Sequence, residues 1–150
     1  MATLIHQRVE AARAGQNLTV VCQMPSGWVV LGDVQFLRGY AILLADPVVS
    51  DLNVLSIADR TRYLLDMSIL GDALLEVTGA VRINYEILGN QDPALHAHVF
   101  PRYADEPEAY RGGPPFFYPA EQRNAIRFDL ERERPLMTHL AEAIARRLGA

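Results

Sequence analysis

Two histidines alternate with apolar residues in the stretch ALHAHVFPRY, which spans residues 94–103. A β-strand repeats every two residues, so His96 and His98 would project from the same face of a strand. A strand that only filled a core would carry Val, Ile or Phe at these positions. A neutral imidazole can donate or accept a hydrogen bond and can act as a nucleophile. The spacing therefore indicates either a catalytic pair, a binding site or a chance arrangement.

Amide side chains precede this stretch and could share a site with the histidines. Asn84 lies in the strand-like run VRINYEI, and the following loop contains Gly89, Asn90 and Gln91. A hairpin from Asn84 to His96 would bring these amides and the free loop N–H groups close to both imidazoles. Amides and backbone N–H groups bind neutral or anionic oxygens, so the combination suits a phosphate held for attack.

The histidines lie in the last of five runs that we expect to form strands. These runs are LTVVCQM, WVVLGDV, YAILLAD, VRINYEI and LHAHVF. The PSG sequence between the first two runs predicts a hairpin turn. Pro101 should end the last strand or confine it to an edge of the sheet, because proline has no N–H to donate.

Helical spacing of apolar residues appears at both ends of the chain and once in its middle. We expect helices over residues 2–14, over residues 56–77 and over residues 134–148. The long middle helix would begin after Ser56 as N-cap and end at Gly79. Residues 104–120, rich in Pro, Gly and aromatics, are interpreted as a surface loop. Runs of strands separated by one long helix favour the α+β class and a single domain over residues 1–150.

Composition excludes several classes of protein and partner. The formal net charge of −4 and the pI of about 5.5 disfavour nucleic acid as a partner. One cysteine, Cys22, excludes an internal disulfide framework and fits a reducing cytoplasm. The first residues lack the apolar core of a signal peptide, and no apolar run approaches a membrane span. We therefore expect a cytoplasmic protein with no membrane partner.

The runs INYEILGN and ALHAHVFPRY together resemble the signature of the histidine triad superfamily of nucleotide hydrolases and transferases. The resemblance includes the Pro101-Arg102 ending and extends back through WVVLGDVQFLRGYAILLAD, so it covers roughly residues 20–103, the expected core. Within the family, it resembles bacterial members that are like diadenosine polyphosphate hydrolases. It implies an antiparallel sheet of about five strands with the long helix packed on it.

The resemblance also assigns roles to the histidines. Alignment on Pro101-Arg102 places His98 at the third histidine of the triad and His96 at the central one, which is the nucleophile in this family. The first position is Ala94 here, and the family's Gly-His pair reads Gly39-Tyr40. His96 would attack the α-phosphorus and form a nucleotidyl-histidine intermediate that water hydrolyses. His98 would hydrogen-bond a non-bridging oxygen or the leaving group.

Four polar residues complete the expected nucleotide site. Gln91 matches a position near the leaving group, and Asn90 lies beside it in the phosphate loop. Asn84 would contact ribose or phosphate. Asp33 would accept two hydrogen bonds from the ribose hydroxyls, which a carboxylate can do. The expected function is therefore hydrolysis or transfer at the α-phosphate of an AMP-bearing substrate, such as a dinucleoside polyphosphate or a nucleoside phosphoramidate.

Two other functions remain open on the sequence. A His-x-His pair on a strand also occurs in zinc and iron sites, although it needs at least one further ligand and no companion is evident. The loss of a histidine at Ala94 leaves room for a protein that binds nucleotides without turning them over. Tyr40 is interpreted as a core aromatic, and the run FFYP at 116–119 either packs on the sheet or closes over the pocket.

We expect no metal or cofactor held by side chains of the protein. A divalent ion such as Mg²⁺ would arrive with a polyphosphate substrate. Members of the family often form homodimers, so a homodimer is an expectation that the resemblance carries.

Overall fold

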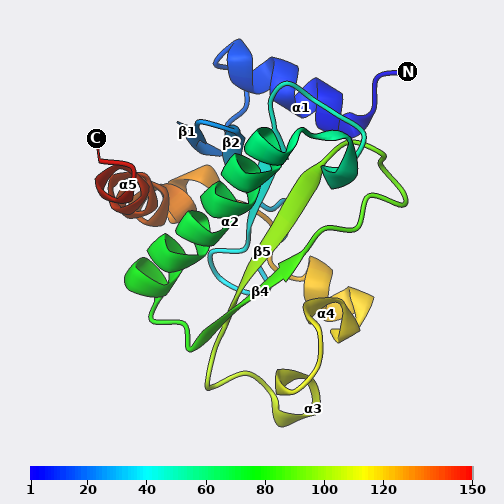
Figure 1. The fold of residues 1–150 in the computed structure, drawn as a ribbon. Helices are drawn as coiled ribbons and strands as arrows, with labels where there is room; N and C mark the ends of the chain where they lie inside the picture. Colours follow the sequence, from blue (N-terminus) through cyan, green and yellow to red (C-terminus); the bar gives the residue numbers. More distant parts are fainter. Residues whose placement is uncertain (150) are drawn as a thin grey trace.

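A five-stranded antiparallel sheet forms the centre of the computed structural model, which describes residues 1–149 (Figure 1). Its strand order is β1-β2-β3-β5-β4, and neighbouring strands run antiparallel. The strands are β1 (Val20–Met24), β2 (Gly27–Leu31), β3 (Ala41–Ala45), β4 (Arg82–Glu86) and β5 (His96–Arg102). The expected α+β class and the sheet of about five strands are confirmed, and so is the hairpin at residues 25 and 26.

The helices divide between the two faces of this sheet. The main helices are α1 (Leu4–Arg13), α2 (Ile57–Thr78) and α5 (Leu130–Arg147). In Figure 1, α2 runs obliquely across the sheet with α5 beside it, and both pack into the larger apolar cluster. The opposite face of the sheet carries α1, whose Ile5 and Val9 pack against Val30, Leu44 and Ala94.

The two-residue period of the strands sorts side chains between these faces. In β5, Ala97 and Val99 belong to the cluster under α2 and α5. His96 and His98 therefore point to the other face, where α1 lies. The same alternation in β3 puts Leu43 in the larger cluster and Leu44 under α1.

The long helix α2 has the ends that its sequence predicts. The Ser56 side chain accepts a hydrogen bond from the Asp59 N–H at 3.1 Å. Gly79 ends the helix with φ of 73°, a left-handed conformation that glycine adopts without the penalty of a Cβ. No helix within residues 1–149 is both long and apolar enough to cross a membrane.

The end of β5 differs from the prediction at Pro101. The strand continues through Pro101 to Arg102 and lies between β3 and β4, so it is not an edge strand. Pairing with β3 ends at Val99, whereas pairing with β4 continues to Arg102. At Pro101 the strand therefore has a neighbour on one side only, which explains why the sheet tolerates a residue without an N–H.

The C-terminal third also differs from the prediction. The last helix begins at Leu130 and not at residue 134, because Asp129 caps it by accepting from the Arg132 N–H at 2.9 Å. The segment 104–120 is not irregular throughout, since it forms the short helix α3 (Glu108–Arg111) and a 3₁₀ turn (Pro115–Phe117) before α4 (Ala120–Asn124). The proline and glycine residues correctly indicated breaks in this segment, but they did not predict the short helical turns between the breaks.

Candidate active site

His96 and His98 share one face of β5, as their spacing predicts, and their ring centroids lie 4.9 Å apart. In β3, Leu44 lies opposite His96 and Ile42 lies opposite His98, and on the other side of β5 His98 also pairs with Glu86 of β4. His96 is 8 % exposed and His98 is half-buried. Because β5 lies between β3 and β4, both imidazoles lie away from the edges of the sheet.

The His96 ring is held by its own strand. Its Nδ1 lies 2.6 Å from the carbonyl oxygen of Ala94. A carbonyl oxygen only accepts hydrogen bonds, so Nδ1 carries the proton and Nε2 keeps its lone pair when the imidazole is neutral. This is the arrangement expected of a nucleophilic imidazole.

Ala94 itself lies beneath α1. Its side chain has no exposed surface and packs with Ile5 and Val9 of the helix. An imidazole at this position would displace α1 from the sheet. Ala94 therefore contributes to the packing that holds the first helix on the sheet.

The His98 ring is held by a tyrosine. Its Nδ1 lies 2.6 Å from the hydroxyl of Tyr40, whose ring stacks on Phe100 with centroids 4.1 Å apart. Burial, followed by the nearby His96, lowers the pKa of His98 to about 4. Burial also raises the pKa of Tyr40, so both groups are neutral at neutral pH. Tyr40 is a core aromatic as expected, but the role of its hydroxyl was missed.

A cavity of about 570 Å³ opens beside the two imidazoles. It brings together four of the predicted site residues, namely His96, His98, Asn90 and Gln91. The remaining lining residues are Leu88, Gly89, Asp92, Phe116 and Arg123. The predicted convergence of the amide loop and the histidines is present in the structure.

Two lining residues come from the C-terminal segment: Phe116, within the expected loop 104–120, and Arg123, to which the sequence analysis gave no role. The Phe116 ring meets His98 edge-on with centroids 5.5 Å apart. The Arg123 guanidinium lies 5.9 Å from the Phe116 ring centroid, and Nη1 donates to the Phe116 carbonyl at 3.4 Å. Of the run FFYP, Phe116 borders the cavity, Phe117 is exposed and Tyr118 is buried. No sequence motif marked Arg123, because it enters the site only through the fold of residues 104–124.

Asp33 does not line the histidine cavity. Its carboxylate pairs with the Arg8 guanidinium of α1 through two hydrogen bonds, one of them 2.8 Å long. The hydrogen bond from Arg8 lowers the pKa of this carboxyl below its ordinary value. Asp33 is nearly half exposed, so it remains accessible to a ligand at that place.

Asn84 also lies outside the cavity. Its Oδ1 accepts a hydrogen bond from Arg102 Nη1 at 2.7 Å, and it borders a different hollow of about 370 Å³. Arg102 in turn forms a buried ion pair with Glu106. Arg102 thus pairs with a carboxylate and binds the Asn84 side chain as well.

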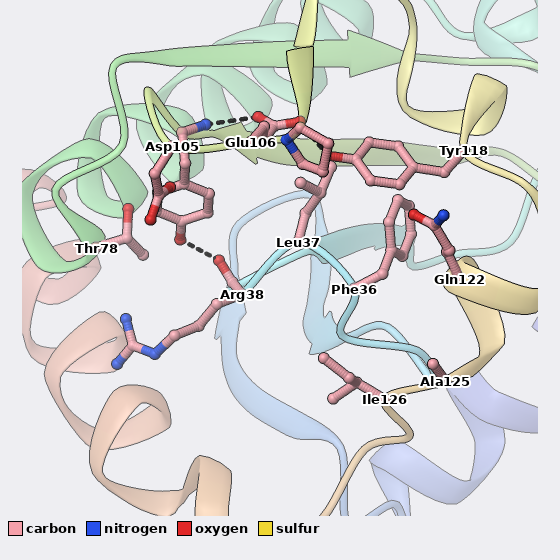
Figure 2. A pocket seen from close by; sticks show the side chains of 12 residues that line it. Phe36, Leu37, Arg38, Thr78, Asp105, Glu106, Tyr118, Gln122, Ala125 and Ile126 are labelled. Atoms are coloured by element: carbon pink, nitrogen blue, oxygen red, sulfur yellow. Dashed lines mark hydrogen bonds between the residues drawn. The ribbon is translucent and has the colours of Figure 1, made fainter. Parts of the chain in front are cut away.

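A second cavity of about 570 Å³ lies in another part of the molecule and contains neither histidine (Figure 2). Its lining includes Phe36, Arg38, Glu106 and Tyr118. The Tyr103 hydroxyl donates to the Arg38 carbonyl, and the Tyr103 N–H donates to Glu106. These bonds join chain segments to one another. With no histidine in its lining, this cavity has no imidazole nucleophile of the kind that His96 supplies to the first cavity.

A metal site at His96 and His98 would need a third ligand, and the described residues do not supply one. Within residues 1–149, no group of three or more His, Cys, Asp and Glu side chains is placed to hold a metal ion. Asp92, the acidic residue of the cavity, accepts a hydrogen bond from the Ile5 N–H of α1 at 3.1 Å.

Comparison with known structures identifies the fold. A histidine triad protein from Marinobacter aquaeolei is 21 % identical, and the match covers 97 % of this chain and 98 % of that one with a TM-score of 0.74. A histidine triad protein from Sinorhizobium meliloti is also 21 % identical, with 83 % and 87 % covered and a TM-score of 0.70. A hypothetical histidine triad nucleotide-binding protein from Sulfolobus tokodaii is 11 % identical, with 93 % and 92 % covered and a TM-score of 0.71.

No protein-family model matches the sequence, and a search of the curated proteins finds no relative. The three structural neighbours match 83–97 % of this chain at low sequence identity. The resemblance of the histidine strand to the triad signature thus agrees with the three-dimensional comparison. This chain has the fold of the histidine triad proteins.

Proposed function

We propose that this chain, built on the histidine triad fold, is a nucleotide hydrolase or nucleotidyl transferase. It would act at the α-phosphate of an AMP-bearing substrate, a dinucleoside polyphosphate or a nucleoside phosphoramidate. The observation that carries the proposal is the hydrogen bond of 2.6 Å between His96 Nδ1 and the Ala94 carbonyl. It leaves the Nε2 lone pair free on an imidazole that lines a cavity of about 570 Å³.

The reaction follows from this tautomer. The Nε2 lone pair of His96 attacks the α-phosphorus, an N–P bond forms, and the bond from phosphorus to the leaving group breaks. The electron pair of that bond departs with the leaving group. Water then attacks the phosphorus of the nucleotidyl-His96 intermediate, the N–P bond breaks, and AMP and a proton are released.

His98 would hold the opposite tautomer. The Tyr40 hydroxyl has one hydrogen-bond partner within the described chain, His98 Nδ1, so donation to this nitrogen satisfies a buried O–H group. A His98 that accepts at Nδ1 carries its proton on Nε2. It can then donate a hydrogen bond to a non-bridging phosphoryl oxygen as charge develops there.

The loop amides supply further contacts to oxygen. Gln91 is suited to the leaving group and Asn90 to the phosphate, since both line the cavity with the histidines. The ribose contact of Asp33 remains a prediction, and the ribose hydroxyls would have to share this carboxylate with Arg8. The contact of Asn84 with ribose or phosphate also remains a prediction, because its Oδ1 is engaged by Arg102.

A variant of His96 tests the proposal. We expect AMP release from diadenosine tetraphosphate or from adenosine 5′-phosphoramidate by the native protein and none by His96→Ala. AMP binding by the variant should stay within about tenfold, roughly 1.4 kcal/mol, of the native affinity. His98→Ala should turn over more slowly but still form the intermediate. Undiminished AMP release by His96→Ala would refute the mechanism.

One observation favours a second candidate, a nucleotide-binding protein with little or no turnover. Ala94 is buried under α1, so this site has no first triad histidine to assist His96. Saturable AMP binding without product release from any of these substrates would distinguish this candidate. A homodimer, a divalent ion that accompanies the substrate and a cytoplasmic location also remain predictions.

A further inference from the structure

Among the described residues that line the histidine cavity, Arg123 is the one arginine, and there is no lysine. The cavity also contains one carboxylate, that of Asp92, while His98 is neutral at neutral pH. Within residues 1–149, no carboxylate forms an ion pair with Arg123. An arginine without an acidic partner beside a candidate nucleophile is available to an anionic ligand.

We propose that Arg123 binds the phosphates of the leaving group, so that dinucleoside polyphosphates are preferred to nucleoside phosphoramidates. This inference rests on the proposed function and narrows its substrate class. It assigns the binding of the leaving group to a residue of the C-terminal segment, outside the strands that carry the histidines.

The position of Arg123 suits the phosphates of a leaving group. Its guanidinium lies 5.9 Å from the Phe116 ring centroid, and the Phe116 ring meets His98 edge-on. Arg123 thus borders the cavity at Phe116, on the side of His98. A polyphosphate whose α-phosphorus meets His96 would place its next phosphates within the same cavity that Arg123 lines.

The present contacts of Arg123 are weak enough for its guanidinium to leave them and bind a phosphate instead. Its hydrogen bond to the Phe116 carbonyl is 3.4 Å long, near the limit of such a bond. A neutral carbonyl and an aromatic ring hold a half-buried guanidinium less strongly than a phosphate would. Arg102 provides the contrast, since its guanidinium is buried and bonded to Glu106 at 2.9 Å.

The chemistry of departure supports the same choice of substrate. When the P–O bond of a polyphosphate breaks, the electron pair stays on a phosphate oxygen, and the product is a stable anion that needs no proton. When a P–N bond breaks, the amine must receive a proton to leave. Burial lowers the pKa of His98 to about 4, so His98 is neutral at neutral pH. It therefore has no acidic proton to give to a departing amine. A cation that stabilises an anionic leaving group is what this site offers.

Paired substrates and a matched control test the inference. We would measure kcat/KM for diadenosine tetraphosphate and for adenosine 5′-phosphoramidate with the native protein, Arg123→Gln and Arg123→Lys. Arg38→Gln is the control, because Arg38 is an exposed arginine that lines the other cavity. Arg123→Gln should lower kcat/KM for the tetraphosphate about 10- to 100-fold, the range for a lost charge-assisted hydrogen bond. The effect on the phosphoramidate should be much smaller, Arg123→Lys should recover part of the loss, and Arg38→Gln should change neither value.

Equal losses on both substrates, or no loss on the tetraphosphate, would overturn the inference. A binding measurement separates this failure from failure of the proposed function. If the native protein releases AMP from neither substrate, calorimetric titration with inorganic tripolyphosphate and with AMP still tests Arg123. Weakening of tripolyphosphate binding by about tenfold in Arg123→Gln, with AMP binding little changed, would support the assignment to Arg123. Equal tripolyphosphate binding by the two proteins, or none by either, would refute it.

Discussion

The two ends of β5 carry polar side chains on the same face of the sheet, but they use them differently. At one end, each imidazole has one ring nitrogen bound, His96 to the Ala94 carbonyl and His98 to Tyr40. The other ring nitrogen of each is left for a ligand. At the other end, all the N–H groups of Arg102 have acceptors within the protein.

The difference separates a candidate site from a structural network. Arg102 has five N–H donors, and they bind Glu106, Asn84 and the carbonyls of Gly113 and Tyr110. Glu106 also accepts from the Tyr118 hydroxyl at 2.6 Å. This end therefore fastens the C-terminal segment to the sheet. Both ends are polar and buried, so the number of unused donors and acceptors distinguishes their roles.

The largest expected effect is on stability at the Arg102 end. Arg102→Leu leaves the buried Glu106 carboxylate without its cation, so the free energy of unfolding should fall by about 3–5 kcal/mol. Arg82→Leu is the control, because Arg82 lies opposite Arg102 in β4 and is exposed. Urea denaturation of both variants measures the difference. A loss below about 1 kcal/mol in Arg102→Leu would mean that the network is not structural.

The histidine end should show a pH dependence of stability. The folded-state pKa of His98 is about 4, against an ordinary value of 6.5, so the unfolded chain binds this proton first as pH falls. The contribution of His98 is present above pH 6.5 and is lost as pH falls from 6.5 to about 4, by up to about 3 kcal/mol. His98→Gln should lack this part of the pH dependence, and exposed His139→Gln should keep it. Identical pH profiles of unfolding for His98→Gln and the native protein would contradict the burial of a neutral His98.

Tyr40→Phe should affect the reaction and leave the cluster of aromatic rings filled. Without the hydroxyl, His98 loses the donor that fixes its tautomer, and kcat should fall about tenfold, or about 1.4 kcal/mol. The ¹⁵N chemical shifts of His98 should report an acceptor Nδ1 in the native protein and a mixture of tautomers in the variant. Tyr110→Phe, elsewhere in the same aromatic cluster, serves as the control. Unchanged ¹⁵N shifts in Tyr40→Phe would show that the hydroxyl does not select the tautomer.

The smallest effect is expected at the exposed pair of Asp33 and Arg8. Asp33→Asn should lower the free energy of unfolding by less than about 1 kcal/mol, because the pair is exposed to solvent. If Asp33 contacts the ribose hydroxyls, the variant should bind AMP several-fold more weakly and 2′-deoxy-AMP with little change. Parallel titrations with both nucleotides measure this. Equal weakening for the two ligands would remove Asp33 from the ribose site.

The sequence predicted those parts of the molecule that depend on local patterns. Alternation in β5 predicted the shared face of His96 and His98, and Ser56 and Gly79 marked the ends of α2. These features follow from the period of a strand and from the caps of a helix, which are local properties. The fold class followed from the order of such elements.

The sequence did not predict contacts that join distant segments. Arg123 reaches the cavity only because residues 104–124 fold into short turns across the sheet, and no periodicity reveals that path. The pairing of Asp33 with Arg8 depends on how α1 lies on the sheet. The bond from Tyr40 to His98 depends on the register between β3 and β5, which a single sequence does not specify.

The central claim is that His96 becomes covalently attached to the nucleotide. The most direct test is to mix the protein with diadenosine tetraphosphate, quench within the first turnover under conditions that preserve N–P bonds, and map the adduct by mass spectrometry. We predict one adenylyl group on His96 in the native protein and in His98→Ala, and none in His96→Ala. Hydrolysis with an adenylyl group on another residue, or AMP release by His96→Ala at the native rate, would contradict the account.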